Sequence, residues 1–197
     1  MSPSGRRIET FIAPMPGCRS AHVAMKLAEL ADVRGQLEAA TRSLNPEQLA
    51  WRPSPDSNSI AMLLTHVALV EVHMSQVGLK GEPHNHVHHV LPITFDDDGI
   101  PIEKYGGQTP AAIAGKPIGF FAELLERAFA HTREACAELD DATLAEEIPR
   151  PPRPDGSYRV FDRRWVLHHL VDHLAQHTGQ VQVLKRQWLA AHPEAVA

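Results

Sequence analysis

Apolar residues recur at three-, four- and seven-residue steps in four separate stretches of the chain. This spacing is typical of a helix that buries one face and exposes the other. The four stretches are residues 20–44, 59–78, 117–139 and 163–191. Gly78 is suited to end the second helix and Asp162 to cap the fourth. Since no convincing set of strands accompanies the helices, the pattern predicts an all-α protein, an antiparallel four-helix bundle.

Three connections separate the predicted helices. In residues 45–58, Asn45 and Pro46 are suited to open a short helical turn, before further prolines impose an extended path. Residues 80–116 form a connection between the second and third helices that is long for a compact domain. A connection of this length indicates either disorder or a functional flap over a cleft. The last connection contains Asp155-Gly156, a tight-turn signal that leads into a short extended segment.

Composition narrows the class of protein. With 197 residues, 43% of them hydrophobic, the chain can bury one sizeable core, so a single domain over residues 1–197 is expected. The net charge of −5 comes without a long basic run, which argues against a nucleic-acid partner. Residues 1–17 are interpreted as an N-terminal extension without the apolar stretch of a signal peptide, and no segment approaches the roughly 18 uninterrupted apolar residues of a membrane span. We therefore expect a cytoplasmic protein.

Cys18 and Cys136 form no CxxC pair, so a bound metal would depend on imidazole and carboxylate ligands.

Histidine is the residue type in excess, with 13 in the chain and four of them in residues 168–177, HHLVDHLAQH. Positions four apart on a helix differ by about 40° around its axis, so His169, His173 and His177 share one broad face. His173 and His177 lie among the apolar residues of the stripe and are predicted to point into the bundle. Such a pair can hold one divalent ion from adjacent turns of a helix.

A third ligand is needed, and the second helix offers His66, which interrupts its buried face. His73 lies two turns further on, about 10 Å along the axis, too far for both side chains to bind one ion. A single histidine on an apolar face is more often a neutral core residue than a ligand. Three inward imidazoles would each need hydrogen-bond partners, however, and one ion satisfies three nitrogens at once. The sequence therefore predicts a metal site formed by His66, His173 and His177.

Two acidic residues lie near these histidines in the sequence. Glu71 follows His66 in the second helix, and Asp172 immediately precedes His173. Both are candidates for acid–base catalysis or for supporting the ligands through hydrogen bonds. A ferritin-like di-iron site is disfavoured, because Glu71 and His73 do not have the spacing of its Glu-x-x-His motif.

Two segments resemble the DinB/YfiT-like superfamily of metalloenzymes. The segment LNPEQLAWRPSPDSNSIAMLLTHVALVE is similar to the family's segment with Trp-Arg-Pro, a Ser-Ile helix start and a ligand histidine. The segment WVLHHLVDHLAQHTGQVQVL is similar to the family's last helix, with HxxxH followed by a glycine and a glutamine. The resemblance implies a four-helix bundle that holds one divalent ion, often zinc or nickel, on His66, His173 and His177. It also implies an open coordination position and, frequently, a homodimer.

The resemblance further implies a function. Members of the family include thiol-dependent transferases and isomerases, which use the ion to bind and activate a low-molecular-weight thiol such as mycothiol or bacillithiol, with a small-molecule substrate. Two alternatives stay open. One is metal-dependent hydrolysis assisted by Asp172 or Glu71, and the other is a non-catalytic stress protein that binds a metal or small ligand. Three histidines also accept iron or copper, so the sequence does not fix the metal.

Two polar clusters lie outside the predicted site. The segment from His84 to His89, HNHVHH, is expected to be a solvated loop tip, and the run from Asp96 to Asp98 is expected at the surface. The alternative is a lid that brings one of these side chains to the open coordination position. Five arginines before the last helix either bind an anionic group at the mouth of the bundle or are solvated: Arg150, Arg153, Arg159, Arg163 and Arg164.

Overall fold

The computed structural model describes residues 11–196 of the chain, so the first part of the predicted N-terminal extension lies outside the described residues. The secondary structure is mainly helical, as the sequence predicts. The elements are α1 (Ala21–Thr41), α2 (Pro46–Ala50), α3 (Ile60–Met74), α4 (Ile118–Cys136), α5 (Asp141–Leu144), β1 (Glu147–Pro149), β2 (Val160–Asp162) and α6 (Arg163–Ala191). A π-helical segment, η1 (Ser75–Leu79), prolongs α3, and short 3-10 turns follow at Val87–His89, Phe95–Asp97, Ile102–Tyr105 and Pro193–Val196.

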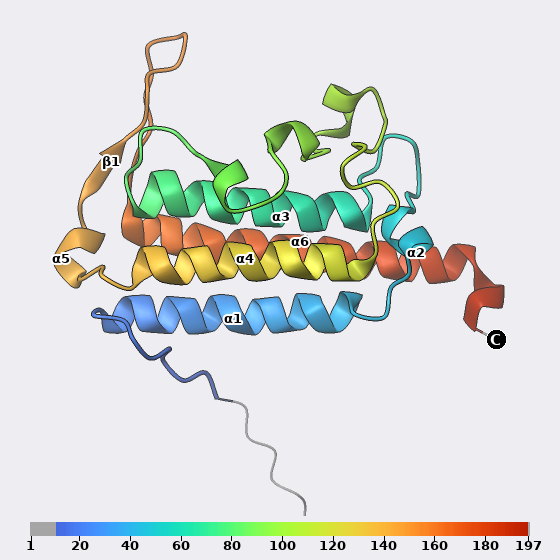
Figure 1. Ribbon diagram of the computed structural model, residues 1–197, viewed down its shortest axis with the longest axis horizontal. Helices are drawn as coiled ribbons and strands as arrows, with labels where there is room; N and C mark the ends of the chain where they lie inside the picture. The colour runs from blue at the N-terminus through green and yellow to red at the C-terminus, as the bar shows by residue number, and fades with distance from the viewer. Residues whose placement is uncertain (1–10, 197) are drawn as a thin grey trace, which may run out of the picture.

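The four long helices lie side by side, with α1 packed on α6 and α3 packed on both α4 and α6 (Figure 1). Figure 1 shows that α1 and α6 run in one direction and that α3 and α4 run in the other. The consecutive pairs α1–α3 and α4–α6 are therefore antiparallel. By contrast, α3 and α4 are parallel, because residues 80–117 carry the chain back along α3 before α4 begins.

The ends of the helices follow local capping chemistry. The Ser59 hydroxyl accepts a hydrogen bond from the Met62 N–H at 3.3 Å, which fixes the start of α3. The Asp162 carboxylate accepts from the Trp165 N–H at 2.8 Å, which confirms the predicted cap of α6. Asn45 and Pro46 open α2 as the sequence predicts, with Asn45 in a capping box. These caps fix the residues at which α3 and α6 begin.

Helix α3 lies at the centre of the core and is buried on nearly every side. Residues 80–116 cover its outer face (Figure 1) and insert five buried aliphatic side chains, from Val87, Leu91, Ile93, Ile102 and Ile113. This cover explains why the segment Ile60–Leu79 is apolar enough in composition to cross a membrane although 78% of its most apolar window is buried inside the protein. The apolar run is therefore that of a core helix.

Gly78, which the sequence suggests as a helix end, instead permits close packing of η1 on α6. A Cβ atom at this position would lie 2.8 Å from Cγ2 of Val166, a buried residue in the first turn of α6. The π-helical segment continues to Leu79, and Gly81 with φ +73° follows it. Gly78 therefore lets the two helices that hold the histidines approach each other.

Gly78→Ala is expected to destabilise the fold by about 1–3 kcal/mol, the usual cost of overpacking a core. Gly35→Ala in α1 is the matched control, because nothing lies within 4 Å of a Cβ there. At that exposed helical position alanine should stabilise by up to roughly 1 kcal/mol. Urea unfolding of both variants measures the difference, and equal stability changes would refute the close-packing argument.

The connection between α4 and α6 contains an antiparallel hairpin of β1 and β2, with Ile148 opposite Phe161. Its tip turns at Gly156 with φ +82°, in agreement with the predicted turn at Asp155-Gly156. The hairpin projects from the end of the group of long helices at which α6 begins (Figure 1). Side chains at its base therefore lie beside the first turns of α6.

Candidate metal centre

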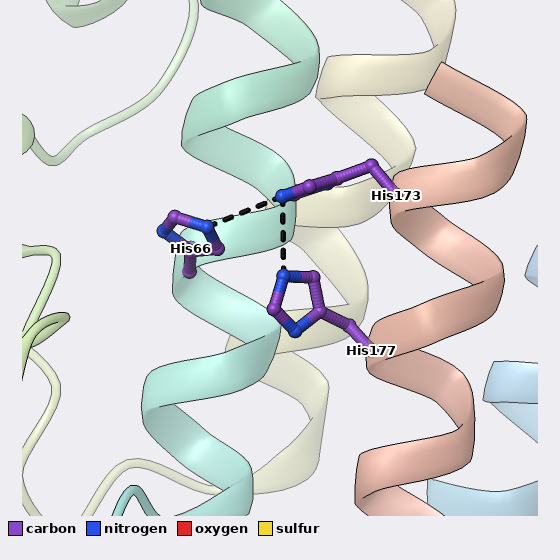
Figure 2. Close-up of side chains that lie close together, drawn as sticks. All are labelled: His66, His173 and His177. Carbon is purple, nitrogen blue, oxygen red and sulfur yellow. Dashed lines mark hydrogen bonds between the residues drawn. The ribbon is translucent and has the colours of Figure 1, made fainter. Parts of the chain in front are cut away.

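The structure brings His66 of α3 together with His173 and His177 of α6 (Figure 2). Nε2 of His173 lies 3.2 Å from Nε2 of His66 and 3.1 Å from Nε2 of His177. One nitrogen from each ring falls within 4.8 Å of the other two. The three side chains, of which His66 and His173 are 107 residues apart in the sequence, therefore converge on one point between the two helices.

Hydrogen bonds behind the rings fix their tautomers. Nδ1 of His66 lies 2.9 Å from the Asp98 carboxylate, which is an acceptor only, so this nitrogen carries the proton. Nδ1 of His177 lies 2.8 Å from the amide oxygen of Gln180 and donates to it in the same way. Both rings therefore direct the lone pair of Nε2 toward the shared point. A partner that holds the far nitrogen of a ligating histidine in this manner is a common feature of metal sites.

The rings of His173 and His177 are held in the neutral form that a metal requires. Burial, and after it the neighbouring imidazoles of His177 and His66, lower the pKa of His173 to about 3. Burial also lowers the pKa of His177, against the opposing effect of its hydrogen bond to Gln180. A proton is therefore a weak competitor at these nitrogens at neutral pH.

The donor set fits a divalent ion. Two ligands at the Zn–N distance of about 2.0–2.1 Å in a tetrahedral site lie about 3.3 Å from each other, close to the two separations seen here. Without a cation, the Nε2 lone pairs of His66 and His177 would both point at Nε2 of His173, which has at most one proton to share between them. Three imidazoles also leave room for a further ligand, as in catalytic rather than structural zinc sites.

Comparison with known families agrees with this arrangement. Residues 29–181, which include the three histidines, Asp98 and the hairpin, match the DinB superfamily. The chain belongs to the DinB superfamily. No curated protein matches the sequence. Membership confirms the resemblance drawn from the sequence, and the three histidines of this DinB protein could hold a metal ion.

The two acidic candidates lie in different surroundings. Glu71 is buried and accepts a hydrogen bond from the Thr132 hydroxyl at 3.0 Å, so its carboxyl group faces α4 and the core. Burial raises the pKa of Glu71 to about 7, although Arg34 opposes the shift. Asp172 is exposed and accepts from the Gln176 amide at 2.6 Å. It lines the hairpin cavity, a hollow of about 440 Å³ between α3, α6 and the β1–β2 hairpin.

Two further histidines flank the centre without joining it. His169 stacks on Trp165 with ring centroids 4.9 Å apart, and His73 packs edge-on against Phe95 at 5.5 Å. Burial, followed by the nearby charge of Arg150, lowers the pKa of His73. Both rings line the hairpin cavity, so they form its wall rather than the group of three ligands.

The remaining polar clusters separate into different environments. His84, His86, His88 and His89 are exposed on the loop, as expected, around the buried Val87. Of the arginines, Arg163 is tied to the Leu79 carbonyl at 2.7 Å and to Glu146 at 2.7 Å, and Arg164 pairs with Asp162. Arg150 and Arg159 line the hairpin cavity, and Arg153 is exposed.

The expectation that the acidic run lies at the surface is wrong for Asp98, which is 6% exposed. Its neighbour Gly99 has φ +78°, and a Cβ there would lie 3.0 Å from Met62 and 3.2 Å from Pro110. Glycine therefore lets the loop descend onto α3 and place the carboxylate behind His66. No periodic pattern in residues 80–116 reveals this path. For Gln180 the sequence offers only a weak signal, which is that a residue three positions after His177 lies on the same face of the helix.

Asp98→Asn is expected to weaken zinc or nickel binding by about 10- to 100-fold, the usual effect of changing a group that supports a ligand. Asparagine lacks the negative charge with which the Asp98 carboxylate holds the Nδ1 proton of His66. Asp96→Asn is the matched control, because Asp96 is exposed in the same turn. Competition with a chromophoric chelator gives both dissociation constants, and equal affinity in the two variants would show that Asp98 does not support His66.

Proposed function

We propose that the protein is a metal-dependent enzyme with one divalent ion on His66, His173 and His177. The ion is zinc or nickel in preference to iron or copper, and it activates a low-molecular-weight thiol for S-transfer or isomerisation. The observation that carries the proposal is the convergence of three Nε2 atoms whose rings are fixed from behind by Asp98 and Gln180. We propose further that the chain is a single-domain four-helix bundle of the DinB/YfiT type that acts as a cytoplasmic homodimer.

Charge supports a thiol as the cosubstrate. The ligands are three neutral imidazoles, and the nearest negative charge identified at the centre is Asp98, behind His66. An ion in such a site would lower the pKa of a bound thiol or water and so supply a nucleophile near neutral pH. Three neutral ligands leave the positive charge of a bound ion uncompensated, and an anionic sulfur would complement that charge better than a neutral ligand would.

The protein side chains have separate tasks in this proposal. Asp98 and Gln180 hold the ligand rings in one orientation, so the site is preorganised before substrate arrives. The hairpin cavity lies beside the centre, because its wall includes His169, whose ring centroid is 5.3 Å from that of His173, and in this proposal it holds the electrophilic partner. Glu71 faces Thr132 and the core, so in this proposal it is not an acid or base at the centre.

Metal-dependent hydrolysis is the second candidate, favoured by one observation. Asp172 lies in the hairpin cavity next in sequence to His173, where a carboxylate could accept a proton from water. In that case the thiol would be dispensable, and Asp172→Asn would lower ester or amide turnover without changing metal content.

Turnover of untagged, metal-loaded protein separates these candidates. We expect a model electrophile to be consumed with bacillithiol, mycothiol or glutathione, and the rate to vanish in His177→Ala. Hydrolysis of an ester and amide panel without any thiol would favour the second candidate. Full metal binding with neither activity would indicate a non-catalytic metal-binding protein and refute the proposed enzyme.

A further inference from the structure

The hairpin cavity carries positive charge at the base of the hairpin, where it is lined by Arg150 and Arg159. Arg150 follows β1 and Arg159 precedes β2, and the Arg150 N–H donates to the Arg159 carbonyl at 2.7 Å. This backbone bond holds both side chains at the base of the hairpin. Among the side chains that the structure describes, neither guanidinium forms a salt bridge, whereas Arg163 and Arg164 both do. Two guanidinium groups therefore face the cavity without a carboxylate of their own.

An aromatic wall leads from these arginines to the metal centre. Phe161, Trp165 and His169 follow one another at four-residue steps, and the same step continues to His173 and His177. Ring centroids are 5.3 Å apart from Phe161 to Trp165, 4.9 Å from Trp165 to His169 and 5.3 Å from His169 to His173. The guanidinium carbon of Arg159 lies 5.3 Å from the centroid of the Trp165 ring. The wall is thus a stack of rings that runs from the arginines to His173, one of the ligands.

One acidic side chain gives the cavity a direction. Asp172 lines it one residue before His173, so its carboxylate lies at the level of the metal centre along α6, although about 100° around the helix from His173. A ligand with a single carboxylate would therefore lie with that group toward Arg150 and Arg159 and its uncharged end toward the centre. The volume of about 440 Å³ falls within the range of small-molecule sites.

We propose that the hairpin cavity binds an aromatic carboxylate, with the carboxylate on Arg150 and Arg159 and the flat ring along the wall of Phe161, Trp165 and His169. This inference rests on the proposed function, because it identifies the class of the electrophilic substrate. Guanidinium groups bind carboxylates through paired, charge-assisted hydrogen bonds, which also select orientation. A substrate held in this way presents its far end to the nucleophile at the centre.

Binding of benzoate to metal-stripped protein, dialysed free of chelator, tests the proposal independently of any activity. Tryptophan fluorescence is the readout, because Trp165 lies in the cavity, whereas Trp51 and Trp188 contact His192 near the far end of α6. We expect saturable quenching that Trp165→Phe abolishes. Benzamide has the same shape without the charge and acetate has the charge without the ring, so both should bind at least roughly tenfold more weakly than benzoate.

Arg150→Gln and Arg159→Gln should each weaken benzoate binding on the order of tenfold to a hundredfold, as expected for the loss of hydrogen bonds to a charged group. Arg153→Gln, at the exposed tip of the same hairpin, should leave it unchanged. Equal binding of benzoate and benzamide by the unaltered protein would overturn the proposal, as would the absence of saturable quenching. Thermal melting confirms that the variants fold. Since no metal or thiol takes part, failure of thiol transfer would leave this result intact, and failure here would leave the metal centre intact.

Discussion

Replacing His173 with alanine is expected to weaken zinc or nickel binding by more than about a hundredfold, because loss of a ligand should exceed the 10- to 100-fold cost of losing a supporting group. His173 is the central member of the group, with its Nε2 within 3.2 Å of both other Nε2 atoms. Two imidazoles on different helices would remain, and they do not enclose an ion. Competition against a chromophoric chelator measures the affinity directly.

His168→Ala is the control for this variant, because His168 is exposed on the same helix, five residues before His173. Zinc at 100 times its dissociation constant should stabilise the unaltered protein and His168→Ala by about 2.7 kcal/mol, and His173→Ala far less. A His173→Ala protein that retains one tightly bound ion would place the metal elsewhere, with the exposed histidines from His84 to His89 as the first alternative.

The second large effect concerns the buried carboxyl group of Glu71. Its pKa is raised from 4.5 to about 7, mainly by burial, so the folded chain holds this proton more tightly than the unfolded chain does. The associated stabilisation is fully present below pH 4.5 and is lost as the pH rises through 7. At about 1.4 kcal/mol per pKa unit, the shift corresponds to roughly 3 kcal/mol. Glu71→Gln should therefore gain roughly 3 kcal/mol relative to the unaltered protein between pH 5 and pH 8.

Urea unfolding of metal-free protein at the two pH values measures this gain. Comparing the variant with the unaltered protein removes the contribution of the half-buried His73 and His131, whose lowered pKa values make stability rise with pH over the same range. Glu123→Gln, an exposed residue of α4, should show no such pH dependence. Parallel pH profiles for Glu71→Gln and the unaltered protein would contradict the assignment of a protonated Glu71 in the core.

Much of the helical framework and the three converging histidines could be predicted from periodicity. Each of the four long helices lies within its predicted range, because an amphipathic stripe is a local property of the sequence. His173 and His177 follow from the same argument, since a four-residue step on a buried stripe fixes their direction. His66 follows from the apolar neighbours that it interrupts.

The path of residues 80–116 could not be predicted, because a connection without periodicity gives no direction for its side chains. Asp98 reaches His66 only through the descent of the loop at Gly99, which depends on tertiary contacts with Met62 and Pro110. The parallel orientation of α3 and α4 has the same origin. The roles of Arg150 and Arg159 likewise depend on where the hairpin meets α6, which the turn signal at Asp155-Gly156 does not specify.

The most direct test of the metal centre is a crystal structure of untagged, zinc-loaded protein with anomalous diffraction data at the zinc edge. The account predicts one strong anomalous peak about 2.0–2.1 Å from Nε2 of His66, His173 and His177. It also predicts that Asp98 and Gln180 stay hydrogen-bonded to the Nδ1 atoms of His66 and His177. A peak bound elsewhere, or three rings turned away from one another with no ion between them, would contradict it.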